Sequence, residues 1–184
     1  KVGPTVADDI KTSAIWSILF ALIAIALYIL IRFRNIAFSA GAVVGLVHDV
    51  LFILGIYSIF YSIMPFSLEI DQSFIAAILT VIGYSINDTV VVFDRIRENV
   101  GLYPKRALNE LINMSVNSTL SRTFSTSFST ALPLLAMFIF GGETIRGFVF
   151  AILLGVIVGT YSTIFIASPI AYDIQQKQAK KAQK

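Results

Sequence analysis

The fold of this chain is decided by residues 75–99, IAAILTVIGYSINDTVVVFDRIREN. The stretch opens with an apolar run long enough to enter a bilayer and closes with charged residues that begin at Asp94. Asn87 and Asp88 lie inside the apolar run. An ionised aspartate at the centre of a membrane helix costs about 2.5 to 3.5 kcal/mol even on insertion-based scales. Asp88 therefore predicts a proton or ion site, and the competing interpretation is an aspartate paired for packing or assembly.

The composition indicates a membrane protein. Of the 184 residues, 57% are hydrophobic and only 14% are charged, which is too apolar for an ordinary soluble domain. The absence of cysteine excludes disulfides and cysteine-based metal sites. The sequence has no H-E-x-x-H motif and no glycine-rich phosphate loop. We therefore expect no metal, nucleotide or other cofactor, no nucleic-acid partner and no enzymatic activity.

Four further apolar runs accompany the run at residues 73–93. Each has the length that a bilayer core requires, about 20 residues at about 1.5 Å rise per residue. The sequence therefore predicts an all-α membrane protein, a bundle of five transmembrane helices over residues 12–31, 37–61, 73–93, 116–139 and 145–171.

Three segments lie outside these predicted spans. Residues 1–11 are expected to form an extracytoplasmic lead-in. Residues 104–114 place their leucine and isoleucine side chains on one helical face, which predicts a helix on the cytoplasmic membrane surface. Residues 173–184 are polar and basic, which predicts a disordered cytoplasmic tail.

Arg122 is the partner that the sequence offers for Asp88. Asp88 lies seven residues before Arg95, about 10 Å inside the end of its span. Arg122 lies a similar distance along the next span, which runs in the opposite direction, so the two charges are expected at matching depth. Pairing would offset part of the cost of removing each from water. Because a buried aspartate holds its proton when isolated and releases it beside an arginine, movement of Arg122 would switch proton binding.

A second polar pair, His48 and Asp49, lies deeper in the second predicted span. Asp49 is expected to act either as a further relay acid or as a structural group, and a lone histidine more often donates a structural hydrogen bond. The residues predicted to support the relay are Asn87, His48, Ser125 and Thr126, although hydroxyl groups in membrane helices more often bond to their own backbone.

Small residues at intervals of four predict close helix contacts. Gly41 and Gly45 have the GxxxG spacing in the second span, and Gly155 and Gly159 continue a stripe of small residues in the fifth. Such stripes let helix backbones approach closely inside a membrane, so we predict packing rather than ligand binding at these positions.

The segment around Asp88 also carries a family resemblance. GYSINDTVVVFDRIREN, residues 83–99, resembles the signature of the SecF protein-export membrane family, a member of the RND superfamily. Further stretches resemble the family in the same order: VGPTV at 2–6, GLVHDV at 45–50, NSTLSRTFSTS at 117–127 and FGG at 140–142.

The resemblance implies half of an RND-type transmembrane domain in the bacterial cytoplasmic membrane, surrounded by membrane lipid. SecD, fused or separate, would supply the other half, and a further helix and an extracytoplasmic domain would precede this chain. The resemblance implies that the pair works beside the SecYEG translocon and uses the proton-motive force, or sodium ions, to promote export of unfolded polypeptides. Asp88 and Arg122 match family residues implicated in proton passage, and Asp49 matches a further recurring acid.

Three different functions compete with this interpretation. Asp49 and Asp88 would share a proton if the chain were an aspartyl intramembrane protease. The Gly-x-Gly-Asp motif of that class is missing, and Arg122 would hold an aspartate ionised. The second is a non-catalytic assembly subunit that docks on a channel, and the third is a different RND-type proton-coupled exporter.

The distribution of basic residues predicts the orientation. The loop after the first span, residues 95–106 and the C-terminal tail all lie on one side of the membrane and contain ten of the fourteen basic residues. The other side contains Lys1, Lys11 and Arg146. The more basic side of a membrane protein faces the cytoplasm. We therefore expect the N-terminus of this chain outside and its C-terminus in the cytoplasm.

Cysteine labelling tests this orientation. Because the chain has no cysteine, single cysteines at Ser67, Tyr103 and Gln178 can be treated with an impermeant thiol reagent. We expect Ser67→Cys to react in intact cells, and Tyr103→Cys and Gln178→Cys to react only after the membrane is permeabilised. Reaction of Tyr103→Cys in intact cells would reverse the assigned orientation.

Overall fold

The computed structural model describes residues 4–182, with side chains over residues 9–181. Five helical stretches in this part of the chain are long and apolar enough to cross a membrane, which confirms the predicted all-α five-helix bundle. The fifth stretch is continuous but contains a π-helical segment, η1. The elements are α1 Pro4–Phe33, α2 Ile36–Phe60, α3 Gln72–Leu102, α4 Leu108–Phe140, α5 Glu143–Ser162, η1 Thr163–Ala167 and α6 Ser168–Ala182.

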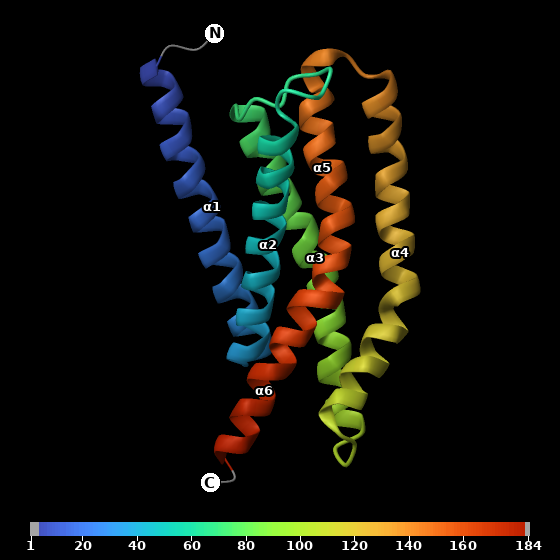
Figure 1. Ribbon diagram of the computed structural model, residues 1–184. Coiled ribbons are helices and arrows are strands. Elements are labelled where there is room, and N and C mark those ends of the chain that lie inside the picture. The colour runs from blue at the N-terminus through green and yellow to red at the C-terminus, as the bar shows by residue number, and fades with distance from the viewer. Residues whose placement is uncertain (1–3, 183–184) are drawn as a thin grey trace.

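Helices α3 and α5 form the centre of the bundle, and α1 and α4 stand at its opposite edges (Figure 1). In the most apolar 18 residues of each span, 44% are buried in α3 and 50% in the run that begins with α5, against 6% in both α1 and α4. The two ends of the chain lie at opposite ends of the bundle, as an odd number of spans requires (Figure 1). Most of the surface of α1 and of α4 therefore remains available to lipid or to another protein.

Local signals explain where the helices begin and end. The Asn35 side chain accepts a hydrogen bond from the Ala37 amide at 2.9 Å and so caps α2. Asp71 caps α3 in the same way, through the Phe74 amide at 2.8 Å. Arg34 ends α1 with a positive φ of 52°, and its amide bonds to Leu30 O at 2.8 Å. The signals at Arg34 and Asn35 make the turn between α1 and α2 short enough to place the two helices side by side.

The structure differs from the sequence prediction in three segments outside the spans. The helix predicted over residues 104–114 is not a separate element, because α4 begins at Leu108 and runs on into the fourth span. No glycine or proline interrupts residues 108–132, so the helix has no reason to break there. The predicted disordered tail continues α6 to Ala182, since its alanine, lysine and glutamine residues favour helix. Helix α1 includes most of the predicted lead-in, whose first three residues lie outside the described part.

Two apolar clusters fill the bundle. The first joins α2, α3 and α5 around Ile53, Tyr57 and Ile78. The second joins α1, α2, α3 and α6 around Phe33, Phe38 and Phe93, whose rings contact one another. On α3 and on the run from α5 to α6, polar residues separate the two clusters. These buried residues are Ser85, Asp88, Thr89, Ser162 and Thr163, and we call them, together with Asp49, the polar layer.

The four glycines predicted at helix contacts lie where helices approach closely. A Cβ atom on Gly155 would collide with the Val81 side chain on α3, and one on Gly159 would lie 2.9 Å from Ser85 Oγ. A Cβ atom on Gly41 would lie 2.5 Å from the carbonyl oxygen of Ala167. Gly45 also lies against Ala167, at 3.3 Å from its Cβ to the added atom. The glycines of the fifth span thus seat α5 on α3, and those of α2 seat it on η1.

The seating of α5 on α3 generates a stability prediction. Gly155→Ala adds a methyl group that has no room beside Val81, and overpacking of this kind costs about 1 to 3 kcal/mol. Gly55→Ala is the matched control, because nothing lies within 4 Å of a Cβ atom at that position. We expect Gly155→Ala to unfold at a lower temperature in detergent than Gly55→Ala, and Val81→Ala to restore part of the loss. Equal unfolding temperatures for the two glycine variants would refute this contact.

Candidate functional site

Asp49 is the centre of the polar layer and is completely buried. Its Oδ2 accepts a hydrogen bond from Ser85 Oγ at 2.7 Å, and its Oδ1 lies 3.2 Å from His48 Nδ1. Ser162 is a further polar neighbour of this carboxylate. His48 is about one-third exposed and lies against the rings of Phe52 and Tyr161. The interior of the bundle therefore satisfies Asp49, and this carboxylate links α2 to α3.

The polar layer continues from Ser85 toward the π-helix. Thr89 Oγ1 lies 2.9 Å from Thr163 Oγ1 across the α3–η1 contact, and 3.2 Å from Ser85 O. Ser168 Oγ donates to Thr163 O at 2.8 Å, which partly satisfies the backbone where η1 widens the helix. Such π-helical segments occur often at functional sites. Sequence reasoning missed Ser85, Thr89 and Thr163, although hydroxyl residues spaced by four in an apolar span were the available signal.

Asp88 lies one turn after Ser85 on α3 and differs from Asp49 in its surroundings. It is only 5% exposed, yet its Oδ2 has no hydrogen-bond partner within the described residues. Arg122 on α4 lies close enough for its charge to act on this carboxylate. The two side chains form no ion pair in the part of the chain that the structure describes. Asp88 is thus a buried carboxylate that the bundle itself leaves incompletely satisfied.

The register between α3 and α4 shifts the expected depth match. Arg95 Nε donates to Ser118 Oγ at 3.2 Å and joins the two helices. Asp88 lies seven residues before Arg95, and Ser125 lies seven residues after Ser118, so the antiparallel helices place Asp88 and Ser125 at the same depth. Arg122 lies three residues before Ser125 and is therefore about one turn, or about 5 Å, from the level of Asp88. The sequence estimate missed this offset because it assumed that the two charges lie equally far from the turn, whereas Arg95 pairs with Ser118 and Asn99 with Ser115 across the two helices.

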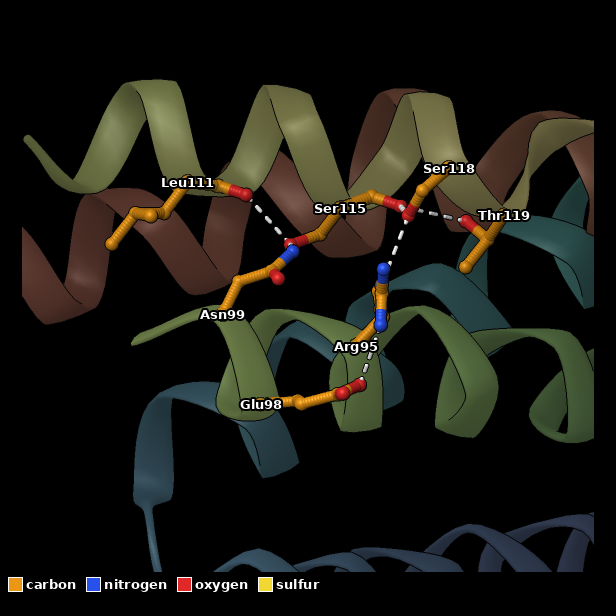
Figure 2. A network of polar contacts seen from close by, with 7 residues as sticks. All are labelled: Arg95, Glu98, Asn99, Leu111, Ser115, Ser118 and Thr119. Carbon is orange, nitrogen blue, oxygen red and sulfur yellow. Dashed lines mark hydrogen bonds and ion pairs between the residues drawn. The ribbon is translucent and has the colours of Figure 1, made fainter. Parts of the chain in front are cut away.

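A groove of about 320 Å³ lies between α3 and α4, and Arg122 is part of its lining. The lining residues are Val91, Asp94, Arg95, Glu98, Ser118, Thr119 and Arg122. Figure 2 shows the polar contacts beside it, in which Arg95 bridges Ser118 and Glu98, the latter at 2.7 Å. Asn99 Nδ2 donates to the buried Ser115 Oγ at 2.7 Å (Figure 2). These contacts hold α3 against α4 at one end of the groove, whereas the Arg122 side chain makes no such contact within the described part of the chain.

The remaining predicted site residues lie on the outer surfaces of α3 and α4. Ser118, Arg122, Ser125 and Ser129 lie at spacings of four, three and four, and we call these residues the polar face of α4. Asn87 is exposed on α3. Thr126 Oγ1 donates to Arg122 O at 2.9 Å, and Ser129 Oγ donates to Ser125 O at 2.7 Å, so these hydroxyls bond to their own helix. The structure thus separates His48 and Asp49, inside the bundle, from the group around Asp88 and Arg122.

These features define a polytopic helical membrane protein whose spans carry ionisable groups, the class to which ion-coupled transport proteins belong. The family model described as "Protein export membrane protein SecD/SecF, C-terminal" matches residues 1–177. The chain belongs to this family, which confirms the resemblance seen in the sequence.

Curated relatives and a solved structure agree with this assignment. The chain is 54% identical over 180 residues to the protein translocase subunit SecF of Rhodothermus marinus, covering 98% of this chain and 58% of that protein. It is 48% identical to the subunit of the same name from Rhodobacter capsulatus, covering 92% and 49%. The crystal structure of SecDF in its super-membrane-facing form matches with a TM-score of 0.82 and 38% identity, covering 100% of this chain and 24% of that chain.

The chain spans about half the length of the curated relatives that it matches. Family membership and the five apolar helices identify a multi-pass protein of the bacterial inner membrane.

The hydroxyl contact between Thr89 and Thr163 generates a prediction about the polar layer. Thr89→Val keeps the shape of the side chain and removes this interhelical hydrogen bond, which in membranes is worth about 0.6 kcal/mol on average and up to about 1.7. Thr80→Val is the matched control, since among the described residues the Thr80 hydroxyl bonds only to Ala76 O on its own helix. We expect Thr89→Val to lower the unfolding temperature more than Thr80→Val does.

A double-mutant cycle with Thr163→Val identifies the partner. The double variant should lose less stability than the sum of the two single variants, because the second substitution removes no further interhelical bond. Additive losses would mean that Thr89 and Thr163 contribute independently.

Proposed function

We propose that this chain is the membrane part of a SecF-type subunit that works with SecD beside the SecYEG translocon and uses the proton-motive force to promote export of unfolded polypeptides. The observation that carries the proposal is the contrast between two buried carboxylates. Asp49 has partners inside the bundle, whereas Asp88 has an oxygen without one among the described residues. The similarity to protein translocase subunits SecF supports the same function.

The free energy of burying a carboxylate explains why Asp88 is the proposed proton carrier. A buried polar group without a partner costs free energy, and an unpaired charge costs much more. A proton, a cation or a group from a partner must therefore compensate Asp88 at each stage of its cycle. Asp49 already has that compensation within the fold, so we assign it a structural role in holding α2 to α3.

Arg122 supplies the group that changes the state of Asp88. Its side chain lies in an open groove about one turn from the carboxylate, and no ion pair in the described residues holds it there. Approach of the guanidinium group favours the ionised carboxylate, and withdrawal favours the protonated one. Movement of α3 against α4 would thus couple proton uptake and release to conformation. A charge that crosses the membrane potential supplies about 2.3 kcal/mol per 100 mV.

The polar face of α4 supports a second membrane half as the partner. A row of hydroxyl groups with an arginine is unfavourable against lipid chains, and such residues normally face the interior of a bundle or a water-filled space. In this chain they lie on the outside, at the edge of the bundle. Ion-coupled transporters commonly place their sites between two structural repeats. We therefore propose that SecD covers this face, with Asp88 and Arg122 at the junction of the two halves.

Substitution of Asp88 tests the proposed function in the full complex. Asp88→Asn keeps the side-chain shape and removes the titrating group, so we expect proton-driven export to be lost while the protein remains folded. Asp173→Asn is the control, because Asp173 is an exposed carboxylate on α6 that does not line the groove between α3 and α4. We expect this control to retain export. Measurement of export in inverted membrane vesicles with and without a proton gradient separates the two results.

Arg122→Met extends the test to the proposed switch. We expect this variant also to lose proton-driven export, because the carboxylate then lacks the cation that favours its ionised form. The two substitutions together should cost less stability than their sum, with coupling of about 0.5 kcal/mol or more. Full proton-dependent export by Asp88→Asn would instead favour a subunit that only docks on a channel.

A further inference from the structure

A basic pocket lies at the end of α1, away from the Asp88 site. Its volume is about 620 Å³, within the range of small-molecule sites, and it is lined by Ile31, Arg32, Phe33, Arg34 and Arg97. Three of these five residues carry guanidinium groups. Arg97 comes from α3, so the pocket bridges an edge helix and a central helix of the bundle.

The pocket keeps an excess of positive charge after its internal contacts are counted. Arg32 pairs with Asp94 at 3.0 Å, which leaves two of the three guanidinium charges without a carboxylate among the described residues. Arg97 donates one bond to Arg32 O at 3.2 Å. The Arg34 side chain has no hydrogen bond or ion pair to the described part of the chain. Because each guanidinium group has five N–H donors, most donors in the pocket stay available to an anion.

Contacts within the chain fix the Arg32 side chain and the backbone at Arg34 before any ligand arrives. Arg32 lies over the Phe33 ring at 5.4 Å from its centroid and is also fixed by Asp94. Arg34 occupies the left-handed position that ends α1, with φ of 52°, where glycine or asparagine is the usual residue. A bulky residue there carries a conformational cost, which suggests that its side chain has a use. Groups that are already ordered lose less entropy when they bind a ligand.

The surroundings of the pocket identify a lipid rather than a soluble anion. Ile31 in its wall is 75% exposed, and Ile36 at the start of α2 is 64% exposed. The exposed apolar side chains of α1 continue from Ile31 along the helix, with Leu27 54% and Tyr28 51% exposed. A guanidinium cluster with an apolar surface leading into it matches a phosphate head group with its acyl chains. Basic pockets between membrane helices on the cytoplasmic side bind such head groups.

We infer that the pocket of Arg32, Arg34 and Arg97 binds the phosphodiester head group of an anionic phospholipid, with the acyl chains lying along the exposed face of α1. The two unpaired guanidinium groups contact the phosphate oxygens, and Ile31 contacts the chains. The site lies on the more basic side of the protein, which the distribution of charges assigns to the cytoplasm. This inference does not depend on proton coupling at Asp88.

Lipid retention tests the site in the full-length protein. The protein is purified in detergent, mixed with equal amounts of phosphatidylglycerol and phosphatidylcholine, and examined by native mass spectrometry for the ratio of the two lipids retained. We expect the unmodified protein to retain phosphatidylglycerol preferentially. Arg34→Gly and Arg97→Gln should each reduce that preference about fivefold, and the double variant about 25-fold, since one basic residue near an anionic surface contributes about 1 kcal/mol.

Two further variants distinguish a specific head-group site from a general attraction of anionic lipid to positive charge. Lys180→Gln with Lys181→Gln removes the same charge from α6, at the same end of the protein, and should leave the preference unchanged. Arg34→Lys with Arg97→Lys keeps the charge and should retain most of the preference. Because glycine suits the backbone at position 34, Arg34→Gly should keep the unfolding temperature of the lipid-free protein.

The opposite results overturn the inference. An equal loss of preference in the variant Lys180→Gln with Lys181→Gln would assign the preference to diffuse charge. Equal retention of the two lipids by the unmodified protein would show that no head-group site exists. Displacement of phosphatidylglycerol by millimolar inorganic phosphate would assign the pocket to a free anion. Unchanged preference in the Arg34→Gly, Arg97→Gln double variant would show that these arginines serve only to orient the chain in the membrane.

Discussion

The hydrogen bond from Ser85 to Asp49 is the interaction on which the centre of the bundle depends. It satisfies a completely buried carboxylate and joins α2 to α3 between two apolar clusters. Gly159 lies against the same serine, so α5 approaches α3 at the level of this bond. Because hydrocarbon provides no other hydrogen-bond donors, loss of this bond would leave the carboxylate with His48 and Ser162 as its polar neighbours among the described residues. The spacing of three helices is therefore set around one polar contact.

The need to satisfy a buried carboxylate also distinguishes the roles of the two intramembrane aspartates. A carboxylate that the fold satisfies is suited to holding helices together, and one that the fold leaves incomplete is suited to exchanging partners. Asp88 has the second character, and the nearby cation Arg122 lies in an open groove rather than in a fixed ion pair. The pairing of Asp49 with Ser85 and His48 also disfavours a protease in which both aspartates share one proton. Burial alone would not have distinguished the two residues, since both are almost inaccessible.

The two edge helices of the bundle, α1 and α4, expose surfaces of different chemical character. The outer surface of α1 is apolar down to a pocket of arginines, which suits lipid chains and a phosphate head group. The outer surface of α4 carries hydroxyl groups and Arg122, which suits another protein or water. The two surfaces lie at opposite edges (Figure 1), so lipid on one and a partner on the other do not compete for space.

The sequence by itself determined the fold class, the five spans and the candidate residue Asp88, because the length of an apolar run and a charge inside it are local properties. It also indicated the contact glycines, since their spacing of four is a property of one helix. Which residue satisfies Asp49 was decided only by the tertiary structure, because Ser85 lies 36 residues away on another helix. The offset between Asp88 and Arg122 was decided there too, because the register of two antiparallel helices depends on which residues pair across them, and Arg95 pairs with Ser118.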